Sequence, residues 1–201
     1  MSLIGRVDIN AKDNEGSTLL HEAAGADGDN VEIFQYLLKN GADINDTDSE
    51  GRTALHWSSV NGNKNITKFI LDNKDKYNVN LDAKDNNGKT SIFKAMFNDT
   101  PGRFEIVKLL IENGANLESK DLEGKTPLHY AYIYGLPEIK ALLEKNGAKD
   151  IPDNSGVKPS ELVMPTHLDV NNQEDIGGKR SRRRRRTQRK SKRKKQTRRR
   201  K

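Results

Sequence analysis

Three histidines recur at equivalent places in the chain, and histidine is well suited to metal binding or to proton transfer near neutral pH. His21, His56 and His129 each lie three residues after a threonine in a repeated motif, and one copy of the motif carries Phe93 instead. A metal site needs ligands that converge on one ion at about 2 Å. Successive stacked helices are about 10 Å apart, so neighbouring copies cannot share an ion. We therefore predict that these histidines are structural and that the chain binds no metal; His167, near the C-terminus, indicates nothing.

The motifs that accompany common catalytic chemistry are absent from the sequence. It has no phosphate-binding glycine loop ending in Gly-Lys-Ser/Thr, no dinucleotide-binding glycine triplet, no His-Glu-x-x-His and no Gly-x-Ser-x-Gly. It also has no cysteine, which excludes disulfides and thiolate nucleophiles. We expect the acidic residues to be scattered over solvent-exposed faces. The sequence predicts a protein that is not an enzyme and uses no cofactor.

The densest cluster of ionisable side chains is a basic segment at residues 179–201. Seventeen of its 23 residues are Lys or Arg and none is acidic. The other 19 basic residues stand against all 29 acidic ones, so residues 1–178 carry a formal charge of −10. Such a contrast within one chain indicates an interaction tail. The cations are Lys179, Arg180, Arg182, Arg183, Arg184, Arg185, Arg186, Arg189, Lys190, Lys192, Arg193, Lys194, Lys195, Arg198, Arg199, Arg200 and Lys201.

Mutual repulsion and the lack of apolar residues predict that this tail is disordered and follows a linker at 166–178. One interpretation is a solvated terminus that only improves solubility. We favour two others, which one segment can combine: binding to DNA or RNA phosphates without sequence preference, and recognition by a nuclear import receptor. Contact with anionic lipid is less favoured, because no amphipathic helix or lipidation motif accompanies the cations. The absence of aromatic residues argues against base stacking.

Four copies of a motif of about 36 residues organise the rest of the chain. Each begins with Gly-x-Thr, and the glycines are 35, 37 and 36 residues apart. The glycine suits a turn with positive φ, and the threonine suits the N-cap of a short helix. A second helix follows, with apolar residues at helical spacing, and in three copies it ends at Asn-Gly-Ala. The four glycines are Gly16, Gly51, Gly88 and Gly124.

These features predict an all-α solenoid of stacked helix pairs. One pair cannot bury its apolar side alone, so we expect each pair to pack against its neighbours. Four complete pairs fit within a domain at 1–165, with partial units at 7–13 and 153–162. Extra residues at 25–30 and 98–102 are expected in loops. The N-terminal face lacks a full capping unit, and we expect it either to fray or to be covered by another element.

The segment Thr126-Pro127-Leu128-His129-Tyr130-Ala131, followed by Gly147-Ala148, resembles the ankyrin repeat, and the likeness extends over about 4–163. The resemblance implies an ankyrin-repeat solenoid of about four full helix-turn-helix repeats plus partial ends. It also implies that the repeated histidine hydrogen-bonds to loop backbone, and that proteins bind on the concave side of the stack. The two glycines and the mixture of Arg, Lys, Ser and Thr at the C-terminus also resemble C-termini in proteins of large eukaryotic DNA viruses, which carry many ankyrin proteins.

Carried over to this chain, the resemblance assigns the concave side to side chains of the hairpin tips and of the first helix in each repeat. Val60, Phe97, Ile133 and Tyr134 would form an apolar stripe there, which indicates a protein partner. The alternative is that an inserted loop covers Phe97 and that the neighbouring aromatic residues pack between helices. The basic residues of the set form a column that is common in the family, with an anionic ligand as a lesser alternative. The candidate residues are Arg52, Val60, Asn61, Lys89, Phe97, Asn98, Lys125, Ile133 and Tyr134.

Together these observations favour a non-catalytic adaptor whose repeats bind a protein and whose tail binds nucleic acid, directs nuclear entry, or does both. The alternative is a protein that condenses or packages nucleic acid, in which the repeats only tether the tail. We expect an intracellular monomer in the nucleus, nucleolus or cytoplasm, of a host cell if the chain is viral. No apolar run is long enough to span a bilayer, so a membrane partner is not expected.

Overall fold

A computed structural model of the chain describes residues 8–97, 99–100 and 102–163, and within these ranges it contains eight α-helices, one 3-10 helix and no strand. The predicted all-α fold with four helix pairs is confirmed. The predicted linker and basic tail, together with His167 and Asn98, lie outside the described residues. The elements are α1 (Leu19–Gly25), α2 (Val31–Lys39), α3 (Ala54–Asn61), α4 (Lys64–Asp72), α5 (Ser91–Phe97), α6 (Arg103–Glu112), α7 (Pro127–Ile133), α8 (Pro137–Lys145) and η1 (Pro159–Glu161).

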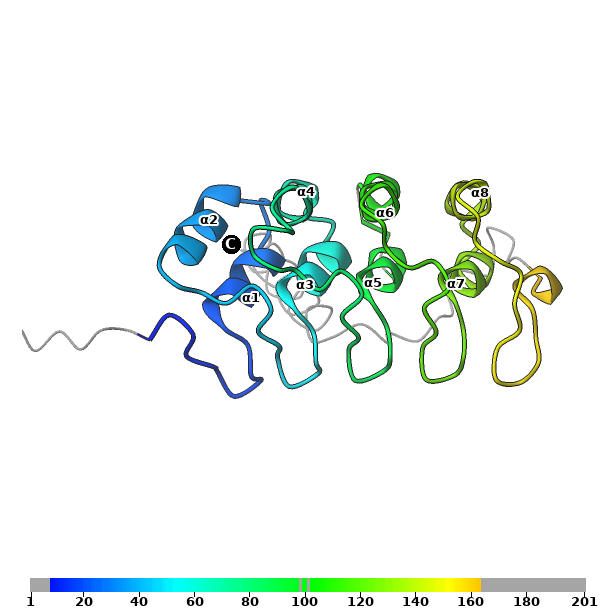
Figure 1. Cartoon of the computed structure of the whole chain (residues 1–201), viewed down its shortest axis with the longest axis horizontal. Coiled ribbons are helices and arrows are strands. Elements are labelled where there is room, and N and C mark those ends of the chain that lie inside the picture. The colour runs from blue at the N-terminus through cyan, green and yellow to red at the C-terminus, as the bar shows by residue number, and fades with distance from the viewer. Residues whose placement is uncertain (1–7, 98, 101, 164–201) are drawn as a thin grey trace, which may run out of the picture. The chain divides into compact units, whose positions relative to one another are not determined.

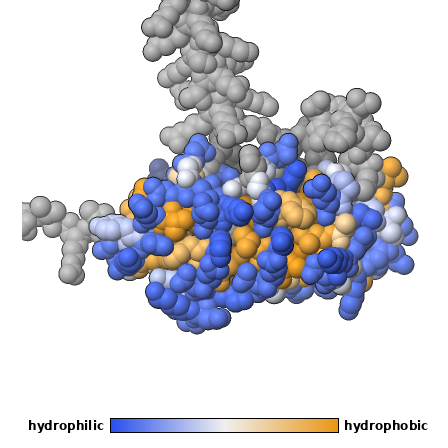
Figure 2. Space-filling view, turned by 90° about the horizontal axis from the view of Figure 1, so that it is seen from above, coloured by the Kyte–Doolittle hydropathy of each residue, from blue (hydrophilic) through white to orange (hydrophobic). Residues whose placement is uncertain are grey.

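The helices form two rows, and each repeat packs against the next. The first helices of the repeats lie side by side, from α1 through α3 and α5 to α7, and the second helices lie above them in Figure 1, from α2 to α8. Hairpin loops project from the opposite side of the first row (Figure 1). Figure 2 looks onto the second row, where hydrophobic surface shows between hydrophilic side chains. None of the helices in the described part of the chain combines the length and apolar character needed to cross a bilayer.

The core runs along the boundary between the two rows. The second residue of each first helix is buried: Leu20, Leu55 and Ile92 are each 1% exposed, and Leu128 is 2% exposed. The second helices contribute isoleucines and leucines that pack into the same continuous cluster. Burial of this kind stabilises a helix that is too short to be stable alone, and α1, α5 and α7 have only seven residues each.

Helix starts and stops follow the predicted signals. Thr18, Thr53 and Thr126 are N-caps with extended backbone, and α5 begins at Ser91, directly after Thr90. The second helices of repeats 1, 3 and 4 end at an asparagine C-cap followed by a glycine. These glycines have the positive φ that favours glycine at C′: 92° at Gly41, 92° at Gly114 and 89° at Gly147.

Successive hairpins are joined through their backbones, and this explains the repeated glycine. The Ser49 N–H donates to the Glu15 carbonyl at 3.0 Å, and the Asn86 N–H donates to the Glu50 carbonyl at 2.9 Å. Gly51 has a φ of +73°, and a Cβ there would lie 3.1 Å from the Asn86 backbone nitrogen. The glycine is therefore required both by its conformation and by the close approach of the next hairpin.

Residues 26–30 of the insertion expected at 25–30 form a loop, as predicted, whereas Gly25 ends α1, and this loop also contacts the next repeat. Asp29 has a positive φ of 48° and accepts hydrogen bonds from the N–H groups of Asn65 (2.6 Å) and Ile66 (2.9 Å). Both N–H groups belong to the first turn of α4, where helical donors lack partners within the helix. In the other direction, the Asn63 amide donates to the Ala24 carbonyl at the end of α1 at 2.8 Å. The loop thus locks the first two repeats together.

Candidate functional site

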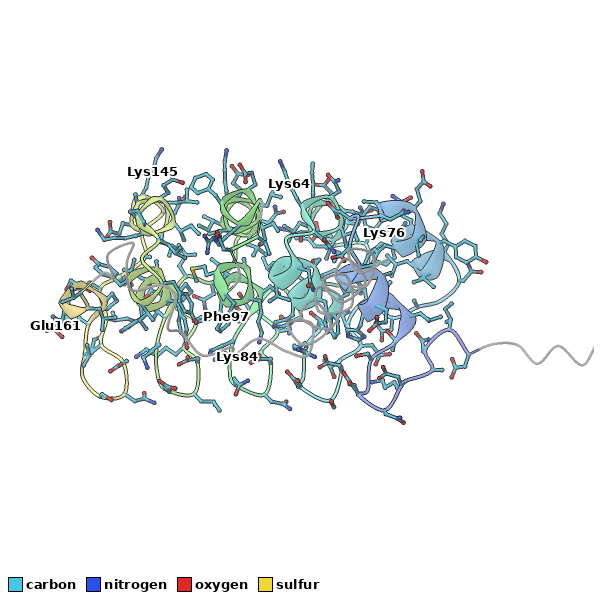
Figure 3. All side chains as sticks on the ribbon, turned by 180° about the vertical axis from the view of Figure 1, so that it is seen from behind. Lys64, Lys76, Lys84, Phe97, Lys145 and Glu161 are labelled. Carbon is cyan, nitrogen blue, oxygen red and sulfur yellow. The ribbon has the colours of Figure 1, made fainter. Side chains whose placement is uncertain are left out.

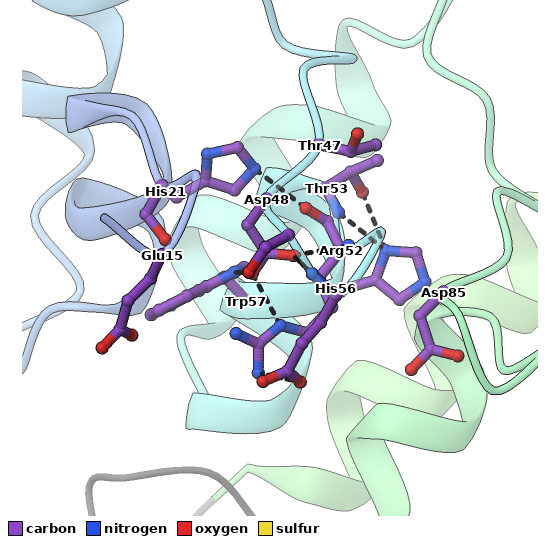
Figure 4. Close-up of polar contacts among 12 residues, drawn as sticks. Glu15, His21, Thr47, Asp48, Arg52, Thr53, His56, Trp57 and Asp85 are labelled. Carbon is purple, nitrogen blue, oxygen red and sulfur yellow. Dashed lines mark hydrogen bonds and ion pairs between the residues drawn. The ribbon is translucent and has the colours of Figure 1, made fainter. Parts of the chain in front are cut away.

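The repeated histidines connect their repeats to the following hairpin, as Figure 4 shows for His21 and Arg52. In each case Nδ1 accepts a hydrogen bond from the N–H of the threonine three residues earlier, as Thr53 does for His56 at 3.1 Å. The Nε2–H tautomer satisfies both ring nitrogens, because Nε2 then donates to a main-chain carbonyl one repeat further on. The Nε2-to-oxygen distances are 2.9 Å from His21 to Arg52, 3.1 Å from His56 to Lys89 and 3.0 Å from His129 to Val157.

This geometry accounts for the histidines without a metal. Both nitrogens of each ring are engaged by protein groups, and a metal ligand needs one of them free. Among the described residues there is no group of three or more His, Cys, Asp or Glu side chains that could hold an ion. Burial lowers the pKa of His21, and it lowers the pKa of His56 to about 4, so the His56 ring is neutral near pH 7. The prediction that the histidines bond to loop backbone is met by all three rings.

The third repeat lacks this connection because Phe93 takes the histidine's place. The Thr90 hydroxyl is buried and has no hydrogen-bond partner within the described residues, whereas the Thr53 hydroxyl contacts His56 Nδ1 at 2.9 Å. Phe93 instead packs edge-on against Tyr130 of the next repeat, with ring centroids 5.4 Å apart. An aromatic contact thus replaces a polar one at this step of the stack.

The expectation that acidic residues are scattered over solvent-exposed faces is wrong for three of them. Asp48, Asp85 and Asp121 are 6%, 5% and 7% exposed. One carboxylate oxygen of each organises its own hairpin: Asp48 Oδ1 accepts from the N–H groups of Glu50 and Arg52, both at 2.9 Å. Buried carboxylates require such partners, since an unpaired charge in the interior is costly.

The second carboxylate oxygen meets a donor of a different type in each repeat. The Trp57 indole N–H donates to Asp48 Oδ2 at 3.0 Å, and the Tyr130 hydroxyl donates to Asp121 Oδ2 at 2.7 Å. Between them, the Lys94 ammonium forms an ion pair with Asp85 Oδ2. Each donor lies nine residues after its aspartate, and each belongs to the first helix of its repeat. The three pairs fix the inner face of the stack, by which we mean the side of α3, α5 and α7 nearest the hairpins.

The pKa of Asp48 reflects the opposing effects of its burial and of its hydrogen-bond donors. Burial acts to raise the pKa, but the Arg52 N–H, the Arg52 guanidinium and the Trp57 indole outweigh it and hold the pKa below its usual value. The Arg52 Nε lies 2.7 Å from Asp48 Oδ2, and its guanidinium lies over the Trp57 ring at 4.8 Å from the centroid (Figure 4). Trp57 is therefore held by two groups of its own hairpin.

An aromatic cluster occupies the inner face between the third and fourth repeats. The Lys89 ammonium lies 4.6 Å from the Phe97 ring centroid and 4.8 Å from that of Tyr130. The Tyr134 ring lies 5.6 Å from both of these rings. Figure 3 shows Phe97 beside α5, between the row of first helices and the hairpins. Cation–π and ring–ring contacts of this kind fix Lys89, Phe97 and Tyr134, which remain partly open to solvent, whereas Tyr130 is buried.

Burial perturbs the titration of this cluster. It lowers the pKa of Lys89, which is half-buried between the rings, and it raises the pKa of Tyr134 to about 12. It also raises the pKa of Tyr130 well above its usual value, and the hydrogen bond to Asp121 adds to that effect. At neutral pH both tyrosines are protonated and can donate.

The structure places the predicted candidates in two environments. Val60, Asn61, Phe97, Ile133 and Tyr134 are all half-buried, so they are neither fully covered nor freely exposed. Phe97 and Tyr134 come together across α5 and α7, and both also pack against the core. Phe97 and Tyr134 therefore belong both to the fold and to the surface.

The basic column is engaged locally. Arg52 pairs with Asp48 and with Glu50 (3.1 Å), and Lys125 pairs with Glu123. Lys89 lies against the rings of Phe97 and Tyr130. The alternative of an anionic ligand on this column stays untested.

Sequence reasoning missed Lys94 and the three buried aspartates. A signal was present, because an aspartate begins every repeat and Trp57, Lys94 and Tyr130 follow it at a constant offset of nine. The offset is meaningful only when the hairpin is known to fold back onto the first helix. The first repeat breaks the pattern, since Glu22 lies nine residues after Asp13 and cannot donate as a carboxylate.

Comparison with known proteins matches the sequence of this chain to one family. Models of ankyrin repeats in three copies match residues 1–82, 33–121 and 77–155. The chain is 32% identical over 130 residues to a putative ankyrin repeat protein of fowlpox virus, FPV223, a match that covers 64% of the chain and 84% of that protein. It is 30% identical over 166 residues to the ankyrin repeat protein OPG189 of variola virus, covering 74% of the chain and 26% of that protein.

A relative from animals is also similar. The chain is 36% identical over 93 residues to mouse protein phosphatase 1 regulatory subunit 27, which covers 46% of the chain and 58% of that protein. The match to the human subunit of the same name covers 46% of its length. The chain thus spans about half the length of these two relatives.

Proposed function

Because this chain belongs to the ankyrin-repeat family, we propose that it is a non-catalytic adaptor. In this proposal the inner face of the repeats binds a protein partner. The basic tail, residues 179–201, binds nucleic acid phosphates, acts as a nuclear address, or does both. The protein then acts inside the cell, in the nucleus, nucleolus or cytoplasm.

The observation that carries the proposal is the aromatic cluster of the inner face. Phe97 and Tyr134 are half-buried, and their rings are fixed against Lys89, Tyr130 and the core. Binding costs less side-chain entropy when the contact side chains are already ordered in the free protein. Aromatic residues are also enriched among the residues that dominate binding energies. Ordered, partly open aromatic side chains such as Phe97 and Tyr134 are thus suited to a protein surface with apolar anchors.

The relatives support a protein partner in general terms. One of them is named as a regulatory subunit of a phosphatase, which is a role exercised by binding another protein. The poxvirus relatives agree with the resemblance seen at the C-terminus of the sequence. From these relatives we carry over only that the chain acts by binding another protein, and experiment must identify that partner.

The tail is included because of its composition. Its seventeen cations face no acidic residue within the segment, and the rest of the chain carries a formal charge of −10. Release of counterions from phosphates favours the binding of such a segment to nucleic acid of any sequence. The same cations fit the acidic grooves of an import receptor.

Deletion of 179–201 from the full chain tests whether the repeats bind the protein partner and the tail binds nucleic acid. The adaptor proposal expects the variant to keep its protein partner in co-precipitation and to lose nucleic acid binding in a gel shift. Loss of both activities would instead favour the alternative in which the repeats only tether a nucleic-acid-condensing tail.

A further inference from the structure

Three of the five large hydrophobic side chains that are exposed within the described ranges belong to the first repeat. Leu19 is 49% exposed, Ile33 54% and Tyr36 64%. Ile33 and Tyr36 are three residues apart on α2 and therefore lie on one face of that helix. We call Leu19, Ile33 and Tyr36 the N-terminal patch. Hydrophobic surface is visible over α2 in Figure 2.

The same positions are covered in the later repeats. Ile66, Ile106 and Ile139, which correspond to Ile33, are 0%, 0% and 3% exposed. Phe69 corresponds to Tyr36, and its ring packs edge-on against Phe34 of the preceding repeat at 6.1 Å. The patch therefore consists of residues that elsewhere in the stack form a repeat-to-repeat interface. Exposed apolar side chains grouped in this way are typical of a surface that binds another element.

The negative charge of the described repeats is concentrated in the first of them. Residues 8–50 contain 11 acidic and 2 basic residues, a formal charge of −9. Residues 51–163 contain 15 acidic and 16 basic residues, a formal charge of +1. Exposed carboxylates of the first repeat include Glu22 on α1 and Glu32 on α2, directly beside Ile33. The patch is thus an apolar surface within an acidic field.

We propose that the N-terminal patch is a docking surface for a basic amphipathic helix of a partner protein. The apolar side of such a helix covers Leu19, Ile33 and Tyr36, as the preceding repeat does at the corresponding positions further along. Its Lys and Arg residues meet the carboxylates around the patch. This surface is distinct from the inner face and is independent of the proposed adaptor function there.

Other occupants fit less well. A second copy joined through the same patch would bring two regions of charge −9 together. A second copy joined through its C-terminal end would offer Lys140 and Glu144 at the positions of Phe34 and Leu38. The chain's own tail supplies cations but has no apolar residue between 179 and 201 to cover the patch.

Binding of synthetic peptides to the full chain tests the proposal. The probe is an 18-residue peptide of Leu and Lys at helical spacing, and its comparators are a scrambled peptide, a Leu/Glu analogue and a Lys/Ser polycation. Fluorescence anisotropy should show that the amphipathic peptide binds at least tenfold more tightly than any comparator. Ile33→Ser/Tyr36→Ser should weaken that binding at least tenfold, and Leu122→Ser, at an exposed hairpin tip, should leave it unchanged.

A second pair of variants tests the role of the carboxylates around the patch. Glu32→Gln should weaken binding and reduce its dependence on salt, whereas Glu105→Gln, at the corresponding position of α6, should do neither. Equal binding by the polycation would assign the site to a segment like the chain's own tail and overturn the proposal. If sedimentation shows that wild type forms dimers and that Ile33→Ser abolishes them, the patch binds a second copy of the chain, and the proposal is overturned. The proposal is also overturned if the Ile33→Ser/Tyr36→Ser variant binds the amphipathic peptide as tightly as wild type while its circular dichroism equals that of wild type.

Discussion

The Nε2 atom of His56 lies 3.1 Å from the main-chain carbonyl oxygen of Lys89, in the hairpin of the next repeat. Lys89 in turn lies against Phe97 and Tyr130 of the inner face. The buried histidine therefore fixes the backbone of Lys89, whose side chain lies against the aromatic cluster. Structural and candidate binding residues belong to one connected network, so tests of function here must separate loss of binding from loss of fold.

Stability should fall as the pH is lowered from 6.5 towards 4.5. Burial lowers the pKa of folded His56 to about 4, while an unfolded histidine titrates near 6.5, so in this window the unfolded state binds more protons than the folded state. From pH 7 to pH 5 this one group should cost about 2 kcal/mol of unfolding free energy. Urea unfolding at a series of pH values measures the loss.

His56→Gln should flatten that pH profile, and His167→Gln should not. The lowered pKa values of Asp48 and Asp85 contribute only below about pH 4, because their stabilisation is lost as those carboxylates are protonated. If the stability of His56→Gln depends on pH as steeply as that of wild type, His56 is not the group whose titration causes the loss of stability.

Two threonines at equivalent positions should respond differently to the same substitution. Thr53→Val removes a hydroxyl that contacts His56 Nδ1, and we expect a loss of about 1–2 kcal/mol. Thr90→Val removes a buried hydroxyl that has no partner among the described residues, and stability should stay within about 0.5 kcal/mol or rise. Chemical unfolding of both variants decides the point; equal losses would show that Phe93 does not alter the cap.

Gly25→Ala should destabilise the protein, although Ala normally favours a helix over Gly. A Cβ at Gly25 would lie 2.5 Å from a ring carbon of Trp57, which Asp48 and Arg52 hold in place. We expect a loss of about 1–3 kcal/mol in unfolding free energy. In a Trp57→Ala background the same substitution should be neutral or stabilising, and an additive double-mutant cycle would refute the clash.

The repeat and the helix ends could be predicted because each depends on local residue types, whereas the backbone bonding of the histidines was implied by the resemblance to the ankyrin family. Gly-x-Thr marks a turn and an N-cap, and Asn-Gly marks a helix end, wherever they occur. The burial of Asp48 could not be predicted in this way, since its donor Trp57 approaches only after the hairpin folds back. The same holds for Asp29, whose bonds to α4 depend on the stacking of two repeats.

The basic tail should bind duplexes of any sequence with a steep dependence on salt. Each neutralised phosphate contributes about −0.9 to the log–log slope on B-DNA, so engagement of half the seventeen cations gives about −8. Gel-shift titrations of the full chain and of the 179–201 deletion over a salt series measure this slope. Equal binding by the deletion variant, or binding that is indifferent to salt, would refute the role of the tail.

The central claim is that the inner face binds a protein partner, and alanine variants of its stripe test it most directly. The full chain with Val60→Ala, Phe97→Ala, Ile133→Ala or Tyr134→Ala is compared with wild type for the affinity of a partner identified by co-precipitation, and for melting temperature. We predict at least tenfold weaker binding for Phe97→Ala and Tyr134→Ala, with cooperative unfolding retained. Unchanged affinity together with a lowered melting temperature would show that these residues serve only the core, and would contradict the account.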